Sequence, residues 1–299
     1  LGRAPTNIQM FIFFLFSFII PHRNSPALLN RLIESIPQRK DIEIIIVDDN
    51  SSIDKRPSII RGDLKIIELE EQDSNGAGHA RNIGLDMAQG EWLLFADADD
   101  FYEPGFIYVL DKYIDSSADI VYFDVFNYNE SIGMSRTLEI ERYTKSSHTE
   151  KDKNRMAFSS NEPWNKMFKR NFILKNNIRF EEIPLGNDAW FVINAGYCAK
   201  KIDVISQKLY HYIDNATGIT KKKRPLEHHY IAIRSLIRRN KIFWLAGLPE
   251  LIPLRIEKYK IVPSYGWGAY LKLMYYYYSH DRKLIPCLIK KIGARFFFI

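Results

Sequence analysis

The chain has 299 residues, of which 46% are hydrophobic and 14% aromatic, so it can bury a large core and is too apolar to be disordered. Its net charge of +6 is unevenly divided, because residues 221–299 carry +13 and the first 220 residues carry −7. Two cysteines, Cys198 and Cys287, exclude a disulfide framework and lie in no Cys/His cluster, which favours reduced thiols and a cytosolic protein.

The first apolar run, Met10 to Ile20, is too short to cross a membrane. Its eleven residues would span about 16 Å as a helix, against a bilayer core of about 30 Å. It also lacks the small-residue cleavage site of a signal peptide and continues directly into Pro21. We therefore expect a buried strand at Phe16–Ile20 and treat residues 1–15 as a leader of uncertain structure.

Strands and helices are predicted to alternate through the first hundred residues. Ile42–Val47 is nearly all β-branched, which is typical of a parallel strand covered on both faces. Small residues such as Ala80 and Gly84 would let the helix that opens at Asn75-Gly76 pack closely on a sheet. This alternation predicts a doubly wound α/β sheet. The expected strands are 16–20, 42–47, 64–69 and 92–96, and the first helix is 26–36.

The pattern beyond residue 100 is less regular. Thr137–Tyr143 alternates apolar and polar residues and is predicted to be the hairpin partner of a preceding strand. Residues 144–161 are polar and predict a loop. The remaining expectations are strands at 120–128 and 163–168, and helices from 171, over 189–199 and over 230–244.

Carboxylates follow two of the predicted strands. Asp97, Asp99 and Asp100 come directly after Trp92–Ala96, while Asp48 and Asp49 follow the second strand. In such sheets, ligands bind beyond the carboxyl ends of the strands. A hard divalent cation would relieve the repulsion among these carboxylates, and a solvated acidic turn that caps the next helix is the alternative. We expect Asp48 to brace a turn rather than to contact ligand.

Together these residues resemble the family 2 glycosyltransferases of GT-A fold over about residues 16–220. The resemblance implies a mostly parallel Rossmann-like sheet flanked by helices, and an enzyme. The matching stretches are FSFIIPHRN (16–24), VDDNSSID (47–54), GAGHARNIG (76–84), GEW (90–92), DADD (97–100), WNKM (164–167) and GND (186–188).

The resemblance implies a donor site for a nucleotide sugar, most simply a UDP-sugar. By position, Asp49 would accept the uracil N3 proton, and Pro21 would line the base. Asp97 would bind the ribose side, and Arg81 would face the nucleotide, although it could instead pair with an acidic neighbour.

The resemblance also implies a metal ligand and a catalytic base. Asp99, in the Asp-x-Asp motif, would ligate Mn²⁺ or Mg²⁺ bridging the diphosphate, and Asp188 would be the base. On residues alone, Asp188 reads as a helix-start carboxylate. A base opposite the leaving group would give inversion at the anomeric carbon.

Three departures qualify the resemblance. Asn187-Asp188 stands where members often have Glu-Asp, and Ile213 replaces a basic residue after Tyr212. No Gln-x-x-Arg-Trp motif occurs, which predicts a non-processive enzyme. The expected function is sugar transfer to a glycan or lipid-linked glycan in cell-surface polysaccharide synthesis.

The expected organisation is a catalytic domain at 16–220 and a helical, basic and aromatic region at 221–299. That region could contact an anionic membrane surface or pack its aromatic residues on the catalytic domain. The expected localisation is therefore cytoplasmic, with peripheral contact at the inner face of the cell membrane as an extension. No nucleic-acid recognition module accompanies the basic charge, so no nucleic-acid partner is expected.

Three other functions are alternatives to sugar transfer. A dinucleotide-binding oxidoreductase would place G-x-G-x-x-G after the first strand, where this chain has Pro-His-Arg-Asn. A sugar nucleotidyltransferase should carry a Gly-rich basic loop near its start, and none is visible. The non-enzymatic alternative is a glycosyltransferase-like membrane adaptor that has lost activity.

Overall fold

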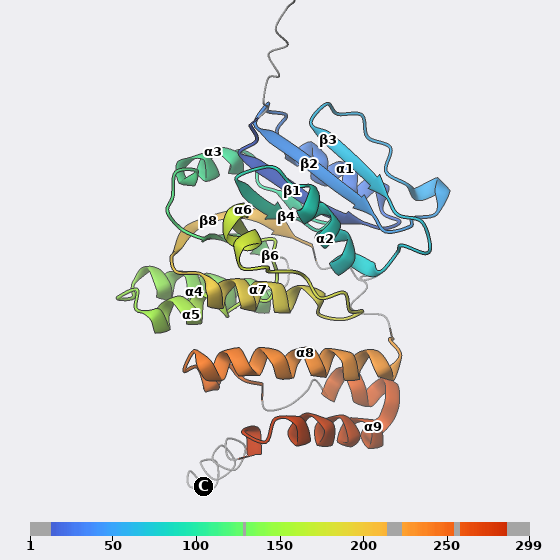
Figure 1. Cartoon of the computed structure of the whole chain (residues 1–299), viewed down its shortest axis with the longest axis vertical. Helices are drawn as coiled ribbons and strands as arrows, with labels where there is room; N and C mark the ends of the chain where they lie inside the picture. Colours follow the sequence, from blue (N-terminus) through green and yellow to red (C-terminus); the bar gives the residue numbers. More distant parts are fainter. Residues whose placement is uncertain (1–12, 128–129, 214–222, 254–257, 286–299) are drawn as a thin grey trace, which may run out of the picture.

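One curved, mixed sheet organises the molecule (Figure 1). The computed structural model describes residues 13–127, 130–213, 223–253 and 258–285. Within them the sheet has eight strands in the order β3-β2-β1-β4-β7-β6-β8-β5. The strands are β1 (Phe16–His22), β2 (Ile42–Asp48), β3 (Leu64–Glu68), β4 (Trp92–Phe95), β5 (Phe101–Tyr102), β6 (Ile120–Asn127), β7 (Lys166–Lys169) and β8 (Ile202–Tyr212).

The first four strands are parallel, so their carboxyl ends meet at one edge of the sheet. β1 pairs in parallel with both β2 and β4, and His22 lies opposite Asp48 in the register. β7 runs antiparallel between β4 and β6, and β8 returns parallel to β6. The expected fold class is confirmed, and the acidic residues that follow β2 and β4 share an edge.

Alternate side chains of the strands fill a separate core on each face. Phe18 and Ile20 pack toward α1 and α3, whereas Ile19 packs toward α2, and all three are fully buried. A Cβ on Gly84 would lie 2.5 Å from Ile19 Cγ2, so this glycine lets α2 lie directly on β1. The helices are α1 (Pro26–Ser35), α2 (Gly76–Met87), α3 (Phe106–Leu110), α4 (Glu130–Thr144), α5 (Glu150–Ala157), α6 (Arg170–Lys175), α7 (Asn187–Cys198), α8 (Leu226–Leu245) and α9 (Lys258–His280).

The segment predicted to be a hairpin strand, Thr137–Tyr143, is instead part of helix α4. The alternation of apolar and polar residues suggested a strand. In the structure, however, the residues that reach the core are Ile140 and Tyr143, three positions apart, while Leu138 is exposed. That spacing places the buried pair on one face of a helix. The hairpin prediction was therefore wrong.

The predicted polar loop at residues 144–161 contains helix α5. Thr149 caps this helix: its side chain accepts a bond from the Asp152 N–H, and the Asp152 carboxylate accepts one from the Thr149 N–H. Such a capping box stabilises a helix start even in a polar segment. The loop prediction was therefore wrong for residues 150–157, because a polar composition does not distinguish a capped surface helix from a loop.

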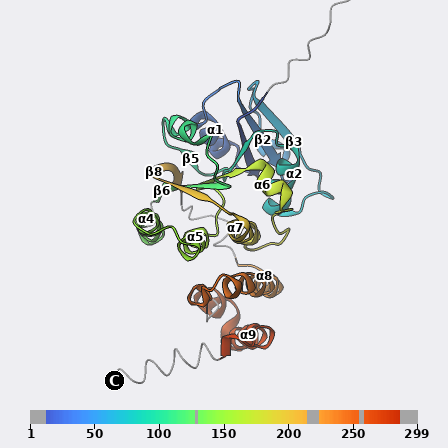
Figure 2. The same cartoon turned by 60° about the vertical axis from the view of Figure 1, so that its left-hand side comes forward.

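The C-terminal helices form two further layers. Figures 1 and 2 both show α8 beneath α7 and α9 beyond α8. Helix α9 is interrupted by a kink at Gly266, where φ is +77°. Buried Asn240 of α8 donates to Tyr277 Oη (2.8 Å) and to Asp281 (3.2 Å), which fixes α9 against α8. Across the described ranges, no helix is long and apolar enough to span a membrane. Residues 1–12, Cys287 and the basic and aromatic tail at 290–299 lie outside those ranges.

Candidate functional site

Arg81 joins two elements that are far apart in the sequence. This buried arginine of α2 donates from Nη2 to Asp97 Oδ1 (2.6 Å), just after β4, and from Nη1 to Asn187 Oδ1 (2.9 Å), at the start of α7. Its guanidinium also lies 5.4 Å from the centroid of the Phe180 ring. Arg81 therefore pairs with an acidic neighbour, and in doing so it builds the centre of the site.

Asp188 lies in the same charged environment, in the first turn of α7. Burial raises the pKa of Asp188 to about 6, Arg81 opposes that shift, and the charges of Glu162 and Asp97 add to it. Taken as a whole residue, Asp188 is partly exposed. A carboxyl group with this pKa is largely ionised at neutral pH and basic enough to accept a proton.

The acidic residues after β4 divide into different roles. Asp100 is fully buried, where its carboxyl accepts hydrogen bonds from Tyr210 Oη (2.9 Å) and from the Ile213 N–H (2.8 Å). Burial, with Asp97 and Asp99 adding negative charge, raises the pKa of Asp100 far above its usual range, to about 9. Asp100 is thus a structural group that ties β8 to the β4 tip, whereas Asp97 and Asp99 remain partly exposed.

The acidic tip of β4 offers a metal ion two partly exposed carboxylates, Asp97 and Asp99. Among the described residues, no group of three His, Cys, Asp or Glu side chains is placed to hold one. Asp97 and Asp99 offer oxygen donors two positions apart, and one Asp97 oxygen is already bonded to Arg81. This donor set fits Mg²⁺ or Mn²⁺ completed by diphosphate oxygens and water, which is how Mg²⁺ commonly binds.

Two buried carboxylates, Asp48 and Asp49, lie at the end of β2. Asp48 accepts from His22 Nδ1 (2.5 Å) and from the Ser51 N–H (3.0 Å), so it braces the turn, as expected. Asp49 Oδ1 accepts from the Gly76 N–H at 3.3 Å, which places it at the N-terminus of α2. Pro21 lies in β1 opposite Val47.

The predicted site residues are thus brought together to different degrees. Arg81, Asp97 and Asp188 share one charged centre, and Asp49 is joined to it through α2, whose first residue contacts Asp49 and whose sixth is Arg81. Asp99 acts electrostatically on Asp100 at the same strand tip.

Sequence reasoning missed the contribution of the segment before α7 and of α8. Arg238 Nη1 donates to Glu181 Oε1 (2.6 Å), and Ser235 Oγ donates to the same carboxylate. The Arg238-Arg239 pair was visible, but its basic charge was attributed to a surface. Only the packing of α8 on α7 shows that Arg238 contacts residues on both sides of Asp188, namely Glu181 and Trp190.

Comparison with known proteins identifies relatives of this chain. The family model described as "Glycosyl transferase family 2" matches residues 17–178. The chain is 26% identical over 223 residues to the putative glycosyltransferase EpsH of Bacillus subtilis, covering 69% of this chain and 62% of EpsH. It is 27% identical over 214 residues to the poly(ribitol-phosphate) β-N-acetylglucosaminyltransferase TarS of Staphylococcus aureus, covering 68% of this chain and 36% of TarS.

Solved structures support the same fold. The crystal structure of S. aureus TarS 1–349 in complex with UDP-GlcNAc aligns with a TM-score of 0.60 at 19% identity, covering 90% of this chain and 92% of that one. A mannosyltransferase from Pyrobaculum calidifontis in complex with GDP-Man and Mn²⁺ aligns with a TM-score of 0.55 at 13% identity, covering 95% and 80%. The described chain therefore has the fold of these transferases, while it spans less than two thirds of EpsH and about a third of TarS.

Proposed function

The chain belongs to glycosyl transferase family 2, and we propose that it transfers a sugar from a UDP-sugar to a hydroxyl of a glycan or lipid-linked glycan. The observation that carries the proposal is the convergence of Arg81, Asp97 and Asp188 at the carboxyl edge of the sheet. This edge is where open α/β sheets bind ligands. TarS, whose name states N-acetylglucosaminyl transfer and whose structure holds UDP-GlcNAc, makes that sugar nucleotide the first donor to test.

In the proposed reaction, Asp188 is the general base. Its carboxylate takes the proton of the acceptor hydroxyl while that oxygen forms a bond to the anomeric carbon of the sugar. The bond from that carbon to the diphosphate breaks, and UDP leaves with the electron pair. Attack on the face opposite the leaving group inverts the anomeric configuration. Arg81 orients the two sides of the site, because it hydrogen-bonds both Asp97 and the neighbour of Asp188.

The proposed donor contacts follow the strand ends. Asp49 accepts from the base of the nucleotide, Pro21 lines that base, and Asp97 binds the ribose side. Asp99 would hold Mn²⁺ or Mg²⁺, which would supply positive charge to stabilise the departing diphosphate. TarS is named for sugar transfer to a polymer, poly(ribitol-phosphate), and this likeness supports the proposal that this chain acts in cell-surface polysaccharide synthesis.

We also propose that residues 221–299 bring the enzyme to an anionic membrane surface on the cytoplasmic side. Trp267, Leu271 and Tyr275 lie four positions apart on one face of α9, and their exposures are 59%, 62% and 78%. Four-residue spacing places all three on one side of a helix. Exposed Lys272 stands beside them, which suits a basic, aromatic contact with anionic lipid.

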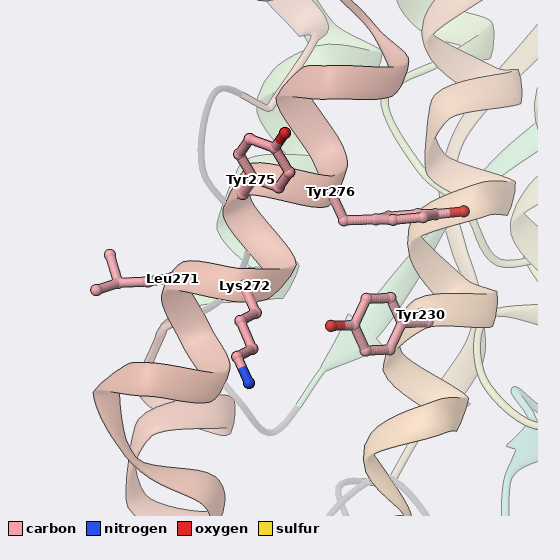
Figure 3. A pocket seen from close by; sticks show the side chains of 5 residues that line it. All are labelled: Tyr230, Leu271, Lys272, Tyr275 and Tyr276. Atoms are coloured by element: carbon pink, nitrogen blue, oxygen red, sulfur yellow. The ribbon is translucent and has the colours of Figure 1, made fainter.

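A groove between α8 and α9 borders this exposed face. Its volume is ≈ 460 Å³. Figure 3 shows Tyr230 and Tyr276 between the two helices, with Leu271 on the outer side. The apolar rim and the adjacent lysine extend the proposed lipid contact. The groove is lined by Tyr230, Leu271, Lys272, Tyr275 and Tyr276.

The proposed activity is tested by UDP release from a panel of UDP-sugars, with glycan acceptors and with Mn²⁺, Mg²⁺ or a chelator. We expect one donor to protect the protein against thermal unfolding and to release UDP only when metal is present. Asp188→Asn should lower the rate by about 10²- to 10⁴-fold. Asp115→Asn, which removes an exposed carboxylate outside the stretches that match the family, is the matched control.

The same assay separates the alternatives. An inactive adaptor would bind the donor without releasing UDP, and its signal would be equal in wild type and Asp99→Ala. A sugar nucleotidyltransferase would release pyrophosphate from a nucleoside triphosphate and a sugar phosphate. Wild-type rates in Asp188→Asn would contradict the assignment of the base.

A further inference from the structure

Two side chains of helix α1 hold the turn that carries Asp99. Arg31 Nη2 donates to the backbone carbonyl of Asp99 (2.5 Å), and Ser35 Oγ accepts from the Tyr102 N–H (3.0 Å). Arg31 and Ser35 are four positions apart, so they lie on the same face of the helix. Figure 2 shows α1 beside β5, the short strand that begins directly after this turn.

The bond from Arg31 completes the fixing of one peptide group of the turn. The carbonyl of that group, from Asp99, accepts from Arg31. Its N–H, from Asp100, donates to the backbone carbonyl of Asp97 (3.0 Å). Rotating this peptide plane would misalign both hydrogen bonds. The backbone from which the Asp99 side chain projects is therefore held in one orientation.

Arg31 makes this contact without pairing with a carboxylate. Among the residues that the structure describes, it has no ion pair and no second hydrogen-bond acceptor, and its Nε is buried without a partner. The guanidinium lies 5.0 Å from the centroid of the Phe101 ring, within the range of a cation–π contact. That ring in turn stacks on His211, with centroids 4.3 Å apart. The direct polar contact of Arg31 with the turn is thus the Asp99 carbonyl.

We propose that Arg31 is a positioning residue for Asp99, the proposed metal ligand. The inference rests on the proposed function, because it takes Asp99 to hold Mn²⁺ or Mg²⁺. The other carboxylate of the turn, Asp97, is bonded to Arg81 from α2. Helices α1 and α2 pack on opposite faces of the sheet, so the two arginines set the two oxygen donors from opposite sides. A fixed separation of these donors suits a metal ion such as Mg²⁺, which demands a near-ideal octahedral geometry.

The charge of Arg31 and its positioning role have opposite effects on metal affinity. Arg31 is a cation beside an acidic turn, so the loss of its charge alone would strengthen the binding of a divalent cation. Loss of a group that orients a metal ligand typically weakens metal binding by about 10- to 100-fold. We expect the positioning effect to dominate, so that Arg31→Met weakens Mn²⁺ binding by about 10-fold.

The test is Mn²⁺ binding to the full chain in the presence of UDP, measured by electron paramagnetic resonance. Arg61→Met is the matched control, because Arg61 also donates to backbone carbonyls of α1 and its C-terminal end, those of Ile33 and Ile36 (both 2.8 Å). It should keep the wild-type Mn²⁺ affinity even where its thermal midpoint falls. Arg31→Lys keeps the charge and a donor, and it should bind Mn²⁺ more tightly than Arg31→Met. Unchanged or tighter binding in Arg31→Met would overturn the proposal.

A second readout depends neither on metal nor on sugar transfer. Hydrogen exchange at the Asp100 and Tyr102 amides of the metal-free protein should be faster in Arg31→Met than in wild type, and unchanged in Arg61→Met. If Asp99→Ala bound Mn²⁺ and UDP like wild type, the metal assignment of the proposed function would fail, and the role of Arg31 toward a metal with it. If Asp99→Ala lost Mn²⁺ while Arg31→Met kept wild-type affinity and exchange, only the positioning role would be rejected.

Discussion

Arg81 Nη2 lies 2.6 Å from Asp97 Oδ1, and this bond connects the helix that follows β3 to the tip of β4. The other terminal nitrogen of the same guanidinium reaches Asn187, the neighbour of Asp188. One buried side chain thus sets the separation between the proposed ribose contact and the proposed base.

Replacing Arg81 should therefore affect activity more than stability. Arg81→Met is expected to lower kcat/KM by about 100-fold or more, because small displacements of positioned groups are costly. It should destabilise the fold by about 1–3 kcal/mol, less than a fully buried pair, since the Asp97 side chain is 32% exposed. Urea unfolding and initial rates measure both. Arg179→Met, which breaks the surface pair with Asp86, should change neither by much.

Activity should depend on ionised Asp188. Because the pKa of Asp188 is about 6, kcat/KM should fall about tenfold per pH unit below that value. This folded-state pKa lies above the ordinary value, so Asp188 adds stability at low pH that is lost as pH rises through 6. Asp188→Asn should then be more stable than wild type at pH 8, by up to about 3 kcal/mol, and not at pH 4. An equal difference at both pH values would argue against the raised pKa.

Asp100 should behave as a neutral structural group. Burial raises the pKa of Asp100 to about 9, so Asp100→Asn should retain activity and cost less than about 1 kcal/mol at pH 7. Asp100→Leu should cost about 2–4 kcal/mol, because Tyr210 Oη and the Ile213 N–H lose their acceptor. Wild type should lose stability as pH rises toward 9, and Asp100→Asn should lose less. Comparing urea midpoints across this range checks both expectations.

Gly78 should tolerate no side chain. A Cβ there would lie closer than 3.0 Å to the backbone carbonyl of Glu181, so Gly78→Ala must displace the segment that leads to Asp188. We expect a loss of about 1–3 kcal/mol and a lower kcat/KM. Gly62→Ala is the matched control, because nothing lies within 4 Å of a Cβ at that position. Equal thermal midpoints for the two variants would show that the contact is relaxed in solution.

The exposed face of α9 should determine membrane contact. Replacing Trp267, Leu271 and Tyr275 by serine should reduce co-sedimentation with phosphatidylglycerol vesicles and leave UDP release unchanged. Binding should weaken with salt and be small on neutral vesicles, because anionic lipid is the proposed partner. Replacing exposed Ile53, Ile60 and Tyr108, which lie outside α8 and α9, gives the matched control. Equal sedimentation of wild type and the α9 variant would exclude this face.

Much of the fold could be predicted from the sequence, because the apolar and capping patterns that mark its strands and helices involve residues close together in the chain. The near-continuous apolar run of Ile42–Val47 marked a buried parallel strand, and Ser25-Pro26 marked the start of α1. Thr137–Tyr143 was misread because a seven-residue segment fits both a strand and a helix. The segment is helical because helical spacing lets Ile140 and Tyr143 both be buried in the core.

The sequence by itself determined the parallel sheet, the family and the carboxylates that follow its strands, since each depends on residues close along the chain. The tertiary structure decided which carboxylates are structural and which are available for chemistry. Asp48 and Asp100 are structural, because they accept hydrogen bonds from Ser51 and Tyr210, whereas Asp188 is partly exposed near Arg81. It also brought Arg238 of α8 against Glu181, in the segment that leads to Asp188. Burial and electrostatic fields arise from groups brought together in space, and no spacing along the chain encodes them.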